Sequence, residues 1–177
     1  MSFEHKAFLF DYGSFQSELE PVLVDALAFG NLAGLISFIE SNSGILRDPY
    51  EGSPLDESWR GLMEEEDAHQ FGDFALTKFY DPRDDIGLGS SWEQVQSALD
   101  EEFGRGSITV LGHAIGPDGA FFDPGKMGSY FLSEEAAREA CRKLRGLQAE
   151  ERTEAINRFL EILERSVAQG KGLYVTF

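Results

Sequence analysis

Apolar residues recur at helical spacing in six separate stretches of the chain. In the clearest stretch, residues 133–146, small apolar side chains follow one helical face and charged side chains fall on the opposite face. Ser133 stands where a helix needs an N-cap, and Gly146 follows the last apolar position. Similar stripes lie in residues 21–29, 31–42, 56–67, 91–103 and 150–169. The pattern therefore predicts about six helices.

Several short runs of aromatic and β-branched residues, bounded by glycine or turn sequences, are typical of strands. They lie near residues 6–12, 107–113, 120–123, 129–132 and 173–177. The turn sequence GPDG at residues 116–119 predicts a hairpin between the second and the third run. Because both terminal regions carry a strand pattern, we expect these two strands to be neighbours in one sheet.

Together these elements predict a single α+β domain over residues 1–177. Its sheet should be small and mainly antiparallel, because few strands are present and turns connect several of them. A chain of 177 residues is long enough to bury a sizeable core in one domain. Residues 71–80 fit either a helix or a strand, and both interpretations stay open.

The net charge of −17 is distributed unevenly along the chain. Residues 1–104 contain 22 acidic and 5 basic side chains, whereas residues 105–177 contain 10 of each. The pattern thus predicts an acidic, helical first part and a charge-neutral, sheet-rich second part. Such a charge repels nucleic acid and anionic membranes, and it favours a basic protein partner. The alternative interpretation is that the acidic surface serves only solubility.

The sequence also predicts a cytoplasmic protein. No apolar run reaches the roughly 18 residues that a membrane-spanning helix requires. The first residues, MSFEHKAFLFDYG, do not follow the pattern of a secretory signal peptide. Cys141 is the only cysteine and lies on a predicted buried helical face, so no internal disulfide is expected.

No stretch of the chain has the spacing of a known catalytic, metal or cofactor motif. The three histidines are scattered, without the short spacings that zinc sites use. The sequence GLGSS at residues 87–91 lacks the lysine of a phosphate-binding loop, and the aspartates in residues 81–85 lack the alternation of a calcium loop. We therefore predict no catalytic residue, no metal and no cofactor.

Five residues are nevertheless candidates for binding. Trp59 and Trp92 offer large aromatic surfaces, although tryptophans at helical spacing more often belong to the core. Asp56 precedes Trp59 by one helical turn and suits a helix cap. His113 directly follows a predicted strand, where side chains often line clefts, and Tyr130 lies in a later one.

Four segments resemble a known family in their order along the chain. These segments are LDESWRGL (55–62), LGHAIGPDG (111–119), GKMGSYFLSEEAAREACRKLRGL (125–147) and NRFLEILERSVAQGKGLYVTF (157–177). Together they are similar to the YfbM-like bacterial domain family over roughly residues 55–177. The resemblance implies a small α+β fold and a cytoplasmic bacterial protein. It implies no activity, partner or catalytic residue.

Three functional hypotheses follow from these observations. The first is a non-enzymatic binding domain for a protein partner, because the charge is one-sided and no catalytic constellation is visible. The second is an immunity-type or DNA-mimicking inhibitor that acts through the acidic first part. The third is an enzyme whose site assembles from His113, Tyr130 and acids on distant loops.

Overall fold

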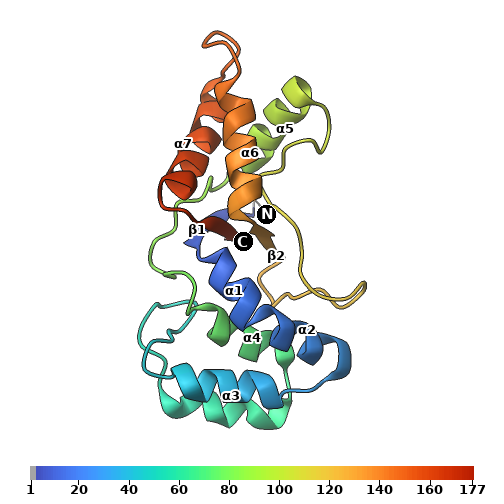
Figure 1. The fold of residues 1–177 in the computed structure, drawn as a ribbon, viewed down its shortest axis with the longest axis vertical. Coiled ribbons are helices and arrows are strands. Elements are labelled where there is room, and N and C mark those ends of the chain that lie inside the picture. Colours follow the sequence, from blue (N-terminus) through green and yellow to red (C-terminus); the bar gives the residue numbers. More distant parts are fainter. Residues whose placement is uncertain (1–2) are drawn as a thin grey trace.

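A small antiparallel sheet forms the middle of the molecule in the computed structural model, which describes residues 3–177 apart from the side chains of residues 63–65 (Figure 1). Its strands are β1 (Lys6–Phe10), β2 (Ser129–Leu132) and β3 (Gly172–Thr176), in the order β1-β3-β2. Lys6 lies opposite Thr176 in the β1–β3 pair. The expected α+β fold and the pairing of the two terminal strands are both confirmed.

The alternation of side chains divides the sheet into two faces that are both buried. The aromatic face consists of Phe8, Phe10, Phe131 and Tyr174. The aliphatic face consists of Ala7, Leu9, Leu132, Leu173 and Val175. Each face belongs to a separate hydrophobic cluster. The sheet is therefore covered by helices on both sides, as Figure 1 shows.

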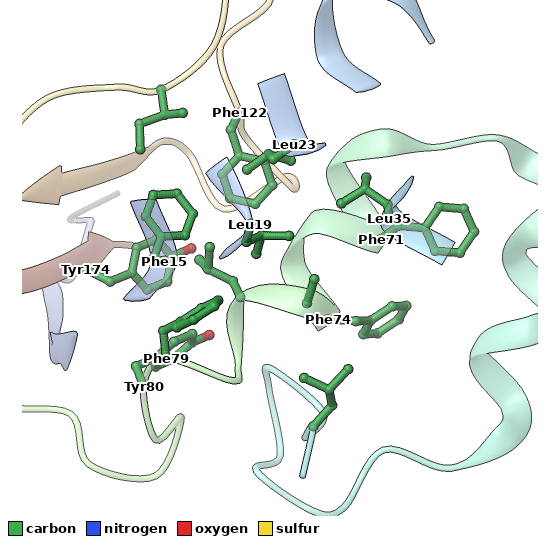
Figure 2. Close-up of a cluster of buried hydrophobic side chains, with 14 of the residues drawn as sticks. Phe15, Leu19, Leu23, Leu35, Phe71, Phe74, Phe79, Tyr80, Phe122 and Tyr174 are labelled. Atoms are coloured by element: carbon green, nitrogen blue, oxygen red, sulfur yellow. The ribbon is translucent and has the colours of Figure 1, made fainter. Parts of the chain in front are cut away.

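The aromatic face packs against the helices that lie below the sheet in Figure 1. These are α1 (Tyr12–Glu18), α2 (Glu20–Phe29), α3 (Ala33–Asn42), the 3-10 helix η1 (Glu57–Glu65) and α4 (Ala68–Leu76). Figure 2 shows their phenylalanine and leucine side chains extending as one cluster from Tyr174 of the sheet, past Phe15 and Leu19, to Phe71 and Phe74 of α4. Residues 11–81, which form this layer, contain 15 acidic and 3 basic side chains.

The aliphatic face packs against α5 (Trp92–Phe103), α6 (Glu134–Arg145) and α7 (Glu154–Ala168), which lie above the sheet. The expected cap of α6 is present, because the Ser133 hydroxyl accepts a hydrogen bond from the amide of Ala136 at 3.1 Å. Thr153 caps α7 in the same way through the amide of Ile156 at 3.2 Å.

The expected hairpin is wrong, because residues 107–113 and 120–123 form no strands. The side chain of Gln96 takes the place of a neighbouring strand: its amide donates to the carbonyl of Ile108 at 2.9 Å and accepts from the amide of Val110 at 3.0 Å. Gly112, with φ at 90°, then turns the chain away. Only a single bridge remains in this segment, between His113 and Phe131.

Three smaller differences concern the first half of the chain. The first strand ends at Phe10 instead of residue 12, because Asp11 accepts a hydrogen bond from the amide of Ser14 at 3.2 Å and so begins α1. The ambiguous residues 71–80 continue α4 to Leu76 and then turn. Residues 56–67 contain a 3-10 helix rather than an α-helix.

Candidate functional site

An ion pair between Lys126 and Asp73 lies under the aromatic face of the sheet, with 2.8 Å between the ammonium and the carboxylate. The two side chains are only 8% and 3% exposed, whereas both partners of every other ion pair among the described side chains are at least 24% exposed. Buried charges need a partner, because burial removes their hydration. This pair is therefore the most unusual electrostatic feature of the described residues.

Local sequence explains how each partner reaches this position. Helix α4 is buried on all sides from Phe71 to Leu76, so the carboxylate of Asp73 has no route to water. Lys126 lies in the turn DPGKMG, which Asp123 stabilises by accepting hydrogen bonds from the amides of Gly125 and Lys126, both at 3.0 Å. The turn directs Lys126 inward, and the ion pair then holds the turn against α4.

Burial dominates the electrostatics of the pair. It raises the pKa of Asp73 from 3.8 to about 6, although the charge of Lys126 and its hydrogen bond act in the opposite direction. The ammonium of Lys126 also lies 4.8 Å from the centre of the Tyr50 ring, a cation–π geometry. Tyr50 thus covers the ion pair from the outside, and its own side chain is 68% exposed.

Two buried tyrosines extend this polar cluster toward the sheet. The hydroxyl of Tyr174 lies 3.0 Å from the hydroxyl of Ser129, and the ring of Tyr80 lies 5.0 Å from that of Tyr174. Burial raises the pKa of both tyrosines, so both hydroxyls stay protonated at neutral pH. Figure 2 shows Tyr80 and Tyr174 together in the aromatic core.

A cavity of about 150 Å³ opens beside this cluster. Six of the residues that line it carry rings, namely Phe8, Pro49, Tyr50, Tyr80, Pro82 and Phe177. The other four are the charged residues Lys6, Asp85 and Lys126, and Thr176. An apolar cavity of about this size holds one benzene molecule in other proteins. We call this cavity the aromatic pocket; Tyr50 forms part of its wall, and Met127, which follows Lys126, is 61% exposed.

Asp56 and Trp59 line a second cavity, of about 370 Å³, which shares Tyr50 with the aromatic pocket. The carboxylate of Asp56 accepts a hydrogen bond from the amide of Ser58 at 2.8 Å, as a helix cap does. Trp59 is almost fully buried and packs edge-on against Phe71, so its main role is in the core.

Trp92 and Tyr130 meet at Phe177, another residue of the aromatic pocket. Their rings lie 5.2 and 6.5 Å from the ring of Phe177. The indole N–H of Trp92 also donates to the carbonyl of Phe3 at 3.0 Å. These two candidates therefore support the wall of the pocket from behind.

His113 lies elsewhere, on the surface next to α1. Its Nε2 lies 3.3 Å from the hydroxyl of Tyr12. Burial raises the pKa of the nearby Glu20, and the positive charge of His113 lowers it in part. Its ring contacts Tyr12, whereas that of Tyr130 contacts Phe177, so the two candidates are not brought into one site. Neither Tyr12 nor His113 lines any of the cavities described here.

Sequence reasoning missed the central residues of this site, namely Tyr50, Asp73 and Lys126. Asp73 did carry a signal, because it is the only acidic residue in the apolar run FGDFALTKFY. A carboxylate within such a run needs a buried partner if the run forms a helix. The partner lies 53 residues away, at a distance that periodicity cannot bridge.

The described residues contain no group of three or more histidine, cysteine or acidic side chains placed to hold a metal ion. Within residues 3–177, no helix has the length and apolar character needed to cross a bilayer. Comparison with known proteins adds nothing to the site, since no family model, no curated protein and no solved structure matches the chain.

Proposed function

We propose that the protein is a non-enzymatic binding domain that takes a basic protein partner at the aromatic pocket. One observation carries this proposal: Tyr50, in the wall of the ring-lined cavity and in contact with Lys126, is 68% exposed, and Met127, the residue after Lys126, is 61% exposed. Exposed aromatic and methionine side chains around a cavity are typical of residues that contribute most to protein interfaces. A cavity of about 150 Å³ suits a single apolar side chain of the partner.

The charges near the pocket support a basic partner. Lys6 and Asp85 both line the pocket and offset each other, so the excess of negative charge comes from Asp48 and Glu51, which line the neighbouring cavity that shares Tyr50. Lys126 adds little positive charge to the surface, because Asp73 neutralises it beneath the ring of Tyr50. A partner whose apolar anchor is flanked by lysine or arginine would therefore be attracted and oriented.

The buried ion pair has a structural part in this proposal. It fixes the turn at residues 123–128 against α4, and this turn carries Met127. The rim of the pocket is then rigid before binding, which lowers the entropy cost of association.

The test compares three versions of the tagged protein in capture experiments from a bacterial lysate. The first is the wild type, the second is the double variant Y50S/M127S, and the third is the control F29S, which removes an 82% exposed phenylalanine at the end of α2. We expect the wild type and the control to retain the same partner, and the double variant to lose it. Capture should also weaken at high salt.

Two results would contradict the proposal. Equal capture by the double variant would show that the aromatic pocket is not the interface. Capture that does not depend on salt would show that charge does not select the partner.

The acidic helical layer favours a second candidate, an inhibitor that imitates nucleic acid. Residues 11–81 contain 15 acidic and only 3 basic side chains, and they form one continuous layer below the sheet. A nuclease assay with added protein tests this candidate, and nucleases encoded beside its gene are the first to try. Inhibition that survives in Y50S/M127S would favour it over the first proposal.

We retain membership in the YfbM-like family and a cytoplasmic location as parts of the same proposal. The first rests on the order of the four motifs in residues 55–177. The second is supported by Cys141, which is a buried free thiol.

A further inference from the structure

The outer edge of β1 is covered at both ends but open in the middle. At one end the carbonyl of Ala7 accepts from the amide of Ile86 at 2.8 Å, and at the other the amide of Asp11 donates to the carbonyl of Phe79 at 2.9 Å. Alternate residues of an edge strand direct their backbone groups outward. Leu9, midway between Ala7 and Asp11, therefore directs its N–H and C=O outward too.

The chain between Phe79 and Ile86 leaves this edge and returns to it. A cavity of about 360 Å³ lies at the gap, within the size range of sites for small ligands. Leu9, Ile45, Thr77, Phe79 and Gln169 line it together with seven other charged or aromatic residues: Asp11, Arg47, Lys78, Tyr80, Asp81, Asp84 and Lys171. We call it the edge cavity.

The carboxylates that line the edge cavity are already engaged. Asp81 is bound by Arg83 through contacts of 2.9 and 2.8 Å, and Asp11 accepts from the amide and hydroxyl of Ser14 at the start of α1. Asp84 faces Arg165 at 3.9 Å. Asp81 and Asp84 therefore each face an arginine already, whereas the hydrogen bonds from Ser14 leave the charge of Asp11 in place.

Two of the cationic side chains that line the edge cavity, Arg47 and Lys171, have no ion-pair partner among the described side chains. The guanidinium of Arg47 makes one hydrogen bond, to the carbonyl of Gly52 at 2.9 Å, and no described carboxylate lies within ion-pair distance of it. The ammonium of Lys171 has no ion-pair partner among the described side chains either. Arg47 and Lys171 are thus two cations without an ion-pair partner, against one such carboxylate, Asp11, and this local excess of positive charge favours an anionic group in the edge cavity.

We propose that the edge cavity binds the C-terminal residue of an extended peptide. The N–H of that residue donates to the carbonyl of Leu9, and its carboxylate accepts from the N–H of Leu9. The ammonium of Lys171 and the guanidinium of Arg47 then pair with the carboxylate. This mode combines backbone pairing with the one open residue of a sheet edge and the charge-assisted capture of a terminal carboxylate.

The lining matches both parts of such a ligand. A peptide residue with a free carboxylate offers one donor and one anionic acceptor, which is what the backbone of Leu9 and the two cations require. Ile45, an exposed apolar residue at the cavity, offers a contact for the side chain of the ligand. A free amino acid carries the same carboxylate, but its ammonium adds a positive charge near Arg47 and Lys171 that the peptide N–H does not carry.

Binding of short, fluorescently labelled peptides to the full chain tests the proposal. The probe is a pool of N-acylated peptides whose C-terminal residue varies over all twenty types, compared with the same pool carrying a C-terminal amide. We expect the carboxylate pool to bind roughly tenfold or more tightly than the amide pool, because a charge-assisted contact is lost in the amide. The K171Q variant should weaken binding by a similar factor, while K171R should keep it.

Two controls separate this site from general charge effects and from the aromatic pocket. R138Q removes an exposed arginine on α6, outside the edge cavity, and should bind the peptides as the wild type does. Y50S/M127S should also bind them unchanged, so a failure of the proposed partner site leaves this test intact. Free amino acids in excess should compete poorly.

Nuclear magnetic resonance gives a readout that does not depend on any substitution. In the ¹⁵N-labelled protein, the carboxylate peptides should shift the amide signal of Leu9 and slow its hydrogen exchange. Equal binding of amide and carboxylate pools, or binding that leaves the Leu9 amide unchanged, would overturn the proposal. No binding of the carboxylate pool at millimolar concentration would overturn it as well.

Discussion

Replacement of Lys126 by methionine tests how strongly the buried ion pair contributes to folding. Methionine keeps an unbranched side chain but removes the ammonium, so the Asp73 carboxylate loses its partner at 2.8 Å. Removing one member of a buried pair typically costs about 3–5 kcal/mol, because the remaining charge stays buried without compensation. We expect the K126M variant to lose about this amount of unfolding free energy at neutral pH.

The loss should depend on pH, because Asp73 can neutralise itself by binding a proton. The pKa of Asp73 in the folded protein is already raised from 3.8 to about 6. This difference of about two pKa units corresponds to about 3 kcal/mol. The folded state binds the proton of Asp73 more tightly than the unfolded state does. Protonation of Asp73 therefore stabilises the fold fully below pH 3.8, and this contribution to the unfolding free energy is lost as the pH rises through about 6. Without Lys126 this pKa rises further, and the deficit of K126M should shrink toward acidic pH.

Urea unfolding followed by circular dichroism at about pH 4.5 and about pH 7 measures both effects. The double variant D73N/K126M is the reference at each pH, because it removes both charges while all other carboxylates titrate as before. It should recover most of the lost stability at neutral pH. A deficit below about 1 kcal/mol in K126M, or one that is equal at both pH values, would show that the pair is hydrated and would refute the reasoning.

Three further substitutions or reactions test other parts of the structure. Gln96→Ala should cost about 1–3 kcal/mol, because two backbone groups near Val110 lose their partner, and the amide of Val110 should exchange faster with solvent. Ser133→Ala should cost about 1 kcal/mol by removing the cap of α6, measured by urea unfolding; Ser133→Asp, which can still cap, should cost less. Cys141 should react slowly with a thiol reagent at neutral pH and quickly in urea, because burial raises the pKa of its thiol; equal rates would show that the thiol is accessible in the folded state.

Local signals predicted most of the helices and the pairing of the terminal strands. The stripes at residues 21–29, 31–42, 91–103, 133–146 and 150–169 correspond to α2, α3, α5, α6 and α7. Their periodicity, and the side-chain caps of α6 and α7, depend on residues within one or two turns, which a single stretch of sequence contains. The hairpin expected at residues 107–123 failed because Gln96, a distant side chain, satisfies the backbone there.

The sequence by itself determined the α+β class, the helical periodicities and the concentration of acidic residues in the first 104 positions. Only the tertiary structure decided where chemistry gathers. It placed Asp73 against Lys126, assembled the aromatic pocket around Tyr50, and left the backbone of Leu9 open between two covered ends of β1. The reason is physical: helical spacing depends on near neighbours, whereas buried ion pairs and open sheet edges depend on segments that meet only after the chain has packed.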